Sequence, residues 1–301
     1  MEAERGGYSL SQRSVGMPTV QTNDIETHYE RHGSGPPLVF IHGALLDAHQ
    51  WRPQVERLRD EYTVFTYDVR GHGRTGGSDR GVYSIELFAD DLDAFLTALD
   101  IERPVLCGLS MGGCIAQVFA SRHPDRVAGL VLADTFTATR LDWRDRLQAV
   151  QLRATILPAR LFGFERVERA MVWLTERFAD GSSGDYGNVK ALRAERPPIP
   201  TREFVKIVRA LVTFPRSTVD LGAITVPALV LYGEDETGFV IRHSAHLHAV
   251  LDESSLVELP DAGHASNMDA PTAFTDALRD FLETAVGSDT GGFAPSWTAS
   301  S

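Results

Sequence analysis

The stretch Val105 to Gly113 constrains the fold more than any other part of the chain. It reads V-L-C-G-L-S-M-G-G, so a short apolar run ends at a serine between glycines and a helical pattern follows. This G-x-S-x-G arrangement predicts a strand, a sharp turn and a helix, with Ser110 at the tip of the turn. Gly108 and Gly112 leave room where the two backbones approach, and we expect a strained Ser110 at a cost of ~1–3 kcal/mol. Taken alone, the pattern also fits an ordinary turn with a capping serine.

Apolar runs and helical patterns alternate on both sides of this turn. Such alternation indicates right-handed crossover units on a mostly parallel sheet flanked by helices, an α/β fold. Residues Thr19 to His32 predict an antiparallel hairpin at a sheet edge, with its turn at Asn23-Asp24. The other predicted strands cover residues 38–41, 62–67, 105–108, 127–133, 228–232 and 255–259. The predicted helices cover residues 50–59, 85–99, 111–122, 241–251 and 271–286.

The alternation stops after the sixth strand. Residues 141–178 and 202–211 have helical spacing instead, which predicts a helical insertion over residues 135–220. We therefore expect a core formed by residues 17–134 and 221–286. The polar residues 1–16 are expected to form a flexible N-terminal arm, and the Gly- and Ser-rich residues 287–301 a disordered tail.

Charge and composition restrict the class of partner. Acidic residues outnumber basic ones 41 to 29, and the net charge of −12 argues against nucleic acid or an anionic membrane surface. No apolar run reaches the ~18 residues of a membrane span, and the polar N-terminus does not resemble a secretory signal. Cys107 and Cys114 give neither a disulfide framework nor a metal-site spacing. We expect a cytoplasmic protein with a small-molecule substrate, no metal and no cofactor, while the oligomeric state stays open.

A base and an acid follow later strands. The run Pro260-Asp261-Ala262-Gly263-His264 places His264 after the last strand, at the same sheet edge as Ser110, where an imidazole could act as general base. The loop after residues 228–232 offers Glu234, Asp235 and Glu236 to orient that imidazole. Any of the three satisfies the order serine, acid, histidine.

Backbone amides complete the predicted site. The loop Ile41-His42-Gly43-Ala44 ends the first buried strand, and the amides of Ala44 and Met111 are predicted to form an oxyanion hole, at ~3–4 kcal/mol per donor. We interpret His42 as a structural residue that bonds nearby loops. The segment Asp68 to Arg74 predicts a turn beneath the oxyanion loop, in which neither Asp68 nor His72 has a chemical role.

These motifs together resemble the α/β-hydrolase superfamily, over roughly Ile25 to Val286. Within it, the chain is similar to esterases, enol-lactonases and cofactor-free perhydrolases of bacteria and archaea. The resemblance implies the α/β-hydrolase fold, with residues 135–220 as the variable helical cap. The family's acid usually stands in Gly-x-x-Asp, and the third residue after Gly233 is Glu236 here, so Glu236 is favoured over Asp235. Asp134 is a further candidate, since some members place the acid after the preceding strand.

A serine at the turn excludes the dehalogenase and epoxide hydrolase branches, which use a carboxylate nucleophile. The sequence therefore predicts a serine hydrolase with the triad Ser110, Glu236 and His264 that cleaves a small carboxylic ester or lactone through an acyl-serine intermediate. One alternative is a carbon–carbon bond hydrolase, lyase or perhydrolase that uses the same triad. Another is a non-catalytic small-molecule receptor.

Overall fold

A computed structural model describes residues 18–170, 192 and 198–283 of the 301-residue chain. The predicted arm at residues 1–16 and the predicted tail at residues 287–301 lie outside these ranges. The same holds for most of residues 171–197, including the end of the helix predicted over residues 141–178.

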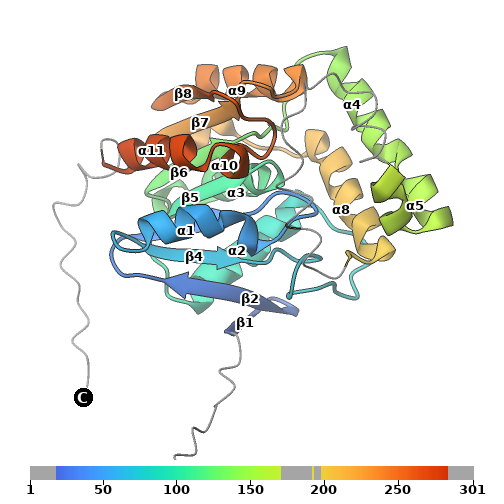
Figure 1. Cartoon of the computed structure of the whole chain (residues 1–301), viewed down its shortest axis with the longest axis horizontal. Helices are drawn as coiled ribbons and strands as arrows, with labels where there is room; N and C mark the ends of the chain where they lie inside the picture. The colour runs from blue at the N-terminus through green and yellow to red at the C-terminus, as the bar shows by residue number, and fades with distance from the viewer. Residues whose placement is uncertain (1–17, 171–191, 193–197, 284–301) are drawn as a thin grey trace, which may run out of the picture.

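The described residues form one eight-stranded sheet in the order β1-β2-β4-β3-β5-β6-β7-β8 (Figure 1). The strands are β1 (Thr19–Thr22), β2 (Ile25–His32), β3 (Pro37–Ile41), β4 (Thr63–Tyr67), β5 (Val105–Leu109), β6 (Gly129–Ala133), β7 (Ala228–Gly233) and β8 (Ser254–Leu259). Strand β2 pairs antiparallel with β1 and β4, and the remaining pairs are parallel. The predicted α/β fold with a mostly parallel sheet and an edge hairpin is confirmed.

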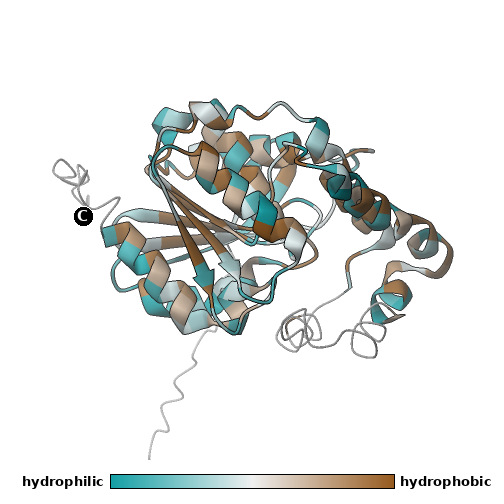
Figure 2. Cartoon of the chain, turned by 90° about the horizontal axis from the view of Figure 1, so that it is seen from above, coloured by the Kyte–Doolittle hydropathy of each residue, from teal (hydrophilic) through white to brown (hydrophobic). Residues whose placement is uncertain are grey.

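Helices cover both faces of the sheet, and the strands between them are the most apolar part of the molecule (Figure 2). They are α1 (Arg52–Leu58), α2 (Ile85–Ala98), α3 (Met111–Arg122), α9 (Gly238–Val250), α10 (Ser266–Asp269) and α11 (Pro271–Phe281). One buried cluster joins the sheet to α2, α3 and α9, and a second joins the opposite face to α1 and α11. Both cysteines lie in these clusters as free thiols.

The chain leaves the sheet after β6, as predicted, and returns to it at β7. In between it forms α4 (Trp143–Ala154), α5 (Ile156–Phe162) and α8 (Thr201–Thr213), which lie together at one end of the molecule (Figure 1). Asp142 begins α4 with a capping box that it shares with Asp145. The insertion has its own small core, in which the rings of Phe164 and Phe204 stack with centroids 4.1 Å apart.

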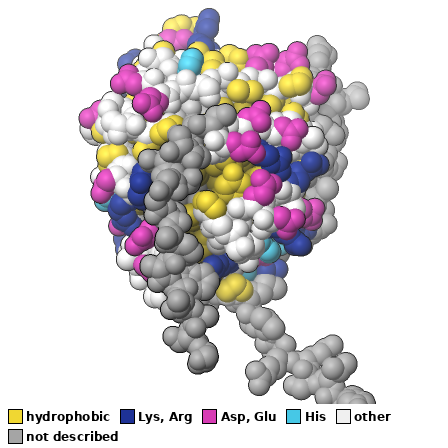
Figure 3. Space-filling view, turned by 90° about the vertical axis from the view of Figure 1, so that its left-hand side faces the viewer, with side chains coloured by type: hydrophobic (Ala, Val, Ile, Leu, Met, Phe, Trp, Pro, Cys, Tyr) yellow, Lys and Arg dark blue, Asp and Glu magenta, His cyan; other side chains and the backbone are white. Residues whose placement is uncertain are grey.

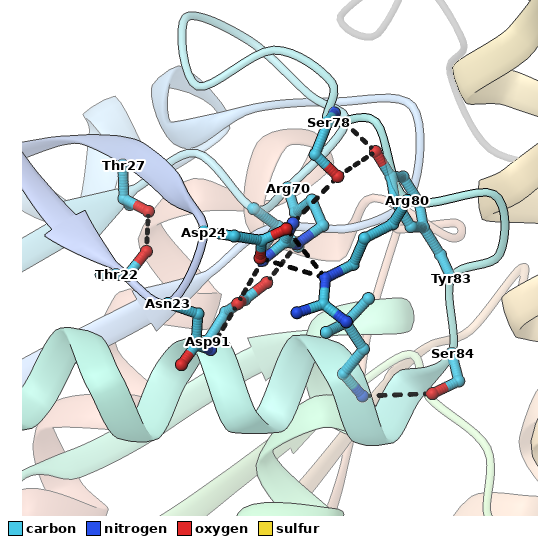
Figure 4. A network of polar contacts seen from close by, with 12 residues as sticks. Thr22, Asn23, Asp24, Thr27, Arg70, Ser78, Arg80, Tyr83, Ser84 and Asp91 are labelled. Carbon is cyan, nitrogen blue, oxygen red and sulfur yellow. Dashed lines mark hydrogen bonds and ion pairs between the residues drawn. The ribbon is translucent and has the colours of Figure 1, made fainter.

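A buried arginine fixes the turn after β4 (Figure 4). The Arg70 guanidinium, which is fully buried, donates to Asp91 of α2 at 2.7 Å and to Asp24 of the β1–β2 turn at 2.7 Å. It also donates to Ser78 Oγ at 2.9 Å. This arginine network therefore joins the edge hairpin, α2 and the loop that precedes α2.

The same loop is tied to the insertion. The Tyr83 hydroxyl lies 3.3 Å from Ser78 Oγ and donates to Glu203 Oε2 of α8 at 2.6 Å. Although Glu203 stands in the first turn of α8, it is only 1% exposed, and Lys206 of the next turn pairs with it at 3.1 Å. Helix α8 is thus attached to the core through buried polar contacts.

The surface carries the acidic excess of the sequence. Figure 3 shows one face on which Asp and Glu side chains lie dispersed among apolar and uncharged groups. Among the described residues, no helix is long and apolar enough to cross a membrane.

Candidate active site

Ser110 stands at the tip of the predicted turn, between β5 and α3. Its backbone has φ 53° and ψ −113°, a conformation that L-residues with a side chain rarely adopt, so the expected strain is present. A Cβ on Gly108 would lie 2.3 Å from the Gly112 carbonyl oxygen, and a Cβ on Gly112 would lie 2.1 Å from the Ile41 carbonyl oxygen. Glycine is therefore required at both positions for strand and helix to approach this closely.

The structure brings Ser110, His264 and Glu236 together. Ser110 Oγ lies 3.0 Å from His264 Nε2, and His264 Nδ1 lies 2.5 Å from Glu236 Oε2. A proton on Nδ1 satisfies the Glu236 carboxylate and leaves Nε2 free to accept from the serine hydroxyl. Since the three residues come from the ends of β5, β7 and β8, the parallel sheet itself accounts for their convergence.

The loop after β7 separates its three acidic residues. Glu236 points inward with a side chain that is 1% exposed, and its Oε1 also accepts from the Thr237 amide at 2.6 Å. Glu234 and Asp235 are exposed, and Asp235 contacts the histidine loop through its amide, which donates to the Ala262 carbonyl at 2.9 Å. Only Glu236 of these three acids contacts the imidazole.

Asp134 lies behind this line of residues and does not bond the imidazole. It is fully buried, with Oδ1 accepting from the Gly233 amide at 3.0 Å and Oδ2 accepting from the Ser266 hydroxyl at 2.5 Å. Burial raises the pKa of Asp134 to about 7, against the opposing effect of the His264 charge, and the nearby Glu236 carboxylate adds to the increase.

The charges of the pair favour an ionised glutamate and a protonated imidazole. Burial opposes both charged forms, but the mutual attraction of the two groups and their hydrogen bond outweigh it. The pKa of Glu236 is consequently lowered, and the pKa of His264 is raised above its usual 6.5, with Asp134 and Asp269 adding to the increase. The imidazole still has 45% of its side-chain surface exposed, so it can exchange protons with a ligand or with solvent.

The loop after β3 lies against the nucleophile. A Cβ on Gly43 would come within 3.7 Å of Ser110 Cβ. The Gly43 amide is already bonded to Gln50 Oε1 at 3.0 Å, whereas within the described ranges the amides of Ala44 and Met111 donate to no protein acceptor. Met111 opens α3, where helical geometry leaves the amides unpaired. The two amides predicted to form an oxyanion hole are therefore available.

His42 and Asp68 stabilise the loops beneath the site, as expected from the sequence. The His42 ring is fully buried, accepts from the Val69 amide through Nε2 at 2.9 Å, and donates from Nδ1 to the Gly43 carbonyl at 2.8 Å. Asp68 accepts from the amides of Ala48 and Arg74 at 2.9 and 2.8 Å. His72 is buried against His42, with ring centroids 4.9 Å apart, and burial lowers its pKa to about 3.

Two residues that the sequence did not single out also belong to the site. The Thr135 hydroxyl donates to the Ser110 carbonyl at 2.6 Å, and Ser266 bonds Asp134. Nothing in the sequence distinguishes them from ordinary loop residues, because their contacts span 25 and 132 positions. Among the residues that the structure describes, no group of three or more His, Cys, Asp or Glu side chains could hold a metal ion.

Comparisons with known proteins agree with this geometry. Residues 36–271 match the family model described as the alpha/beta hydrolase fold. A thermophilic esterase from Thermogutta terrifontis superposes with a TM-score of 0.74 at 29% identity, over 89% of this chain and 98% of that one. The enol-lactonase of Burkholderia xenovorans LB400 gives a TM-score of 0.73 at 27% identity, over 88% and 99%. A 3-oxoadipate enol-lactonase of Acinetobacter baylyi is 27% identical, over 86% of this chain and 94% of its own length.

Proposed function

The chain belongs to the alpha/beta hydrolase fold family, and from this premise we propose that it is a serine hydrolase that cleaves a small carboxylic ester or lactone through an acyl-serine intermediate. The observation that carries the proposal is the continuous line from Ser110 Oγ to His264 to the buried Glu236 carboxylate, at 3.0 and 2.5 Å. An ordinary capping serine has no need of a general base within hydrogen-bond distance.

In the first half of the reaction, Ser110 Oγ attacks the carbonyl carbon of the ester while its proton passes to His264 Nε2. The amides of Ala44 and Met111 donate to the carbonyl oxygen as it becomes negatively charged, and each such donor contributes about 3–4 kcal/mol in known enzymes. Strain at Ser110 keeps Oγ in the attacking position, so little ordering remains to be done when substrate arrives.

In the second half, the tetrahedral intermediate collapses and the imidazolium returns its proton to the leaving alkoxide. With a lactone, this alcohol stays attached to the acyl group. Water then attacks the acyl-serine, with His264 again taking the proton, and the free acid leaves. Glu236 stays ionised throughout, because it stabilises the imidazolium and fixes the Nδ1–H tautomer.

We further propose that residues 17–134 and 221–286 form the catalytic core and that residues 135–220 form a cap that shapes the binding site. Helix α8 carries apolar residues of the insertion core, including Phe204, Val205 and Val208. An apolar cap favours an uncharged acyl or ring substituent over a highly charged one. The esterase and the enol-lactonases among the relatives support this substrate class.

The test combines labelling with turnover. A fluorophosphonate is expected to add one adduct to the intact protein, located on Ser110 by peptide mapping, and Ser110→Ala is expected to remain unmodified. A panel of p-nitrophenyl esters of increasing acyl length, together with small lactones, should then be hydrolysed by the wild type and not by Ser110→Ala. An unmodified wild-type protein, or an adduct at another residue, would rule out the proposed nucleophile.

A further inference from the structure

We propose that Asp134 and Thr135, which directly follow β6, are positioning residues that hold the three loops of the triad in register. This inference rests on the proposed function, because it concerns the same site. Neither residue touches the position of a bound ester, so both act through other residues. Together they contact the nucleophile turn, the acid loop and the histidine loop.

Asp134 joins the acid loop to the histidine loop. One carboxylate oxygen accepts from the Gly233 amide, three residues before Glu236, at 3.0 Å. The other accepts from both the amide and the hydroxyl of Ser266, two residues after His264, at 3.3 and 2.5 Å. The two loops also abut directly, since a Cβ on Gly233 would lie 2.2 Å from the Ala262 carbonyl oxygen. A shift of the Asp134 carboxylate would therefore change the separation of Glu236 and His264.

Thr135 supports the nucleophile turn. Its hydroxyl donates to the Ser110 carbonyl at 2.6 Å, and the Cys114 amide donates to the same oxygen at 3.1 Å. A Cβ on Gly113 would lie 2.6 Å from the Thr135 hydroxyl, which shows how tightly α3 packs against this side chain. Because Ser110 has an unfavourable backbone conformation, bonds to its carbonyl help to keep the turn from relaxing.

The chemistry of Asp134 is unusual for a residue that only fills space. Its carboxylate is fully buried, and within the described residues no Lys or Arg pairs with it. Its backbone lies in the left-handed region with φ 45°, which disfavours a residue with a side chain. A buried charge without a cationic partner destabilises a fold. Asp134 therefore combines two unfavourable features with contacts to two triad loops, as expected of a residue retained for the site.

Asp134→Asn tests the carboxylate. The amide keeps the shape and one acceptor but places an NH₂ group opposite the donors of Gly233 or Ser266. We expect kcat to fall about 10²-fold with KM little changed, the effect of a misplacement of about 1 Å. The acid limb of kcat/KM should also move to lower pH, because His264 loses one of the carboxylates facing it and keeps only Glu236 and Asp269.

Two further variants guard against loss of folding and against a general effect of buried carboxylates. Ser266→Ala removes the shortest hydrogen bond to Asp134 from the other loop, and it should reduce kcat in the same direction by a smaller factor. Asp145→Asn changes a buried carboxylate that faces His243 and Arg242 in the insertion, outside the triad. It should leave the midpoint of the pH profile unchanged.

Thr135→Val and Thr135→Ser test the hydroxyl. Valine removes the donor to Ser110 with little change of shape, and we expect about a 10-fold loss of kcat, consistent with a weakened turn. Serine keeps the donor and should restore most of the activity. Thr137→Val is a matched control, because Thr137 is equally buried and its hydroxyl bonds only the Thr139 amide.

The outcomes separate this inference from the proposed function. If the wild type is not labelled at Ser110, the proposed function fails before the variants are measured. If the wild type is labelled and hydrolyses esters, an Asp134→Asn protein with kcat within about twofold of wild type and an unmoved pH midpoint overturns the role of Asp134. Equal kcat for Thr135→Val and Thr135→Ser overturns the role of Thr135.

Discussion

Two networks of buried carboxylates in this molecule differ in one respect, the ability of the cationic partner to release its proton. Around Arg70, Asp91 and Asp24 surround a fully buried guanidinium (Figure 4). Around His264, Glu236 contacts and Asp134 faces an imidazole that is 45% exposed. Both networks place charge in the interior, but only the second has a partner that titrates near neutral pH.

The difference determines what each network can do. Burial alone would lower the pKa of the guanidinium, but its bonds to Asp91 and Asp24 raise it beyond an already high value, so Arg70 stays charged. The arginine network therefore acts as a permanent structural joint. The histidine network exchanges one proton at Nε2, beside Ser110 Oγ, and lies where four parallel strands end. The following predictions test this contrast, from the largest expected effect to the smallest.

His264→Ala should abolish the chemistry without unfolding the protein. Removing the general base of a triad lowers kcat by about 10⁴-fold or more, which corresponds to about 5 kcal/mol of lost transition-state stabilisation. The half-exposed imidazole leaves little buried volume empty. Single-turnover ester hydrolysis and urea unfolding, measured on the same preparation, should show lost turnover with a nearly unchanged midpoint. Turnover within about tenfold of wild type would contradict the assignment of His264.

Arg70→Met should do the opposite. It leaves Asp91 buried without its cation, and breaking such a pair destabilises proteins by about 3–5 kcal/mol. Arg80→Met is the matched control, because Arg80 binds the same Asp24 from a side chain that is 48% exposed, where an ion pair contributes less than about 1 kcal/mol. Urea unfolding measures both. Activity per folded molecule should persist, and equal stability losses in the two variants would refute the contrast.

Glu236→Gln should lower kcat by about 10²–10³-fold, because the amide no longer stabilises the imidazolium or fixes its tautomer. Asp235→Asn, one residue earlier and exposed, should change kcat by less than about twofold. Hydrolysis of a p-nitrophenyl ester by the two variants gives the comparison directly. A larger loss in Asp235→Asn would transfer the role of the acid to that residue.

The outline of both networks follows from local patterns, but their partners do not. Apolar periodicity predicted α3 with its observed bounds and brought Ser110 and His264 to one sheet edge, because strand and helix patterns are local properties of the chain. The choice of Glu236 needed the spacing of a resembling family, since three adjacent acids look alike in sequence. Its proposed role remains a prediction for the experiments above.

The buried polar contacts were beyond the reach of the sequence for a physical reason. Glu203 occupies a first-turn position where an acidic residue is normally solvated, and only the packing of α8 on Tyr83 buries it. Asp134 bonds Ser266 across 132 positions, and Arg70 bonds Asp24 across 46. Such pairs depend on how the elements pack, and a single sequence carries no signal for them.

The pH dependence of activity should follow the histidine network alone. His264 must be neutral to accept the serine proton, and Glu236 raises its pKa above 6.5. The value of kcat/KM should therefore rise with pH to a midpoint above 6.5. In Glu236→Gln the residual activity should have a lower midpoint, because the raising charge is gone. An unmoved midpoint would mean that another group sets the limb.

The pH dependence of stability should have opposite signs in the two networks. Because the folded pKa of His264 is raised, its contribution to the free energy of unfolding is fully present below 6.5 and is lost as the pH rises through the folded value. The Arg70 hydrogen bond lowers the pKa of Asp24, against a smaller effect of burial, from 3.8 to about 2. The contribution of Asp24 is therefore present above 3.8 and is lost as the pH falls towards 2.

Thermal unfolding of matched variants separates these two contributions. The difference in Tm between wild type and His264→Ala should shrink between pH 6 and pH 10, as the imidazole of the wild type loses its charge. The difference between wild type and Asp24→Asn should stay constant over that interval and shrink only in acid. A histidine difference that grows with pH would mean that the neutral imidazole is the form that the fold stabilises, which would reverse the contrast between the two networks.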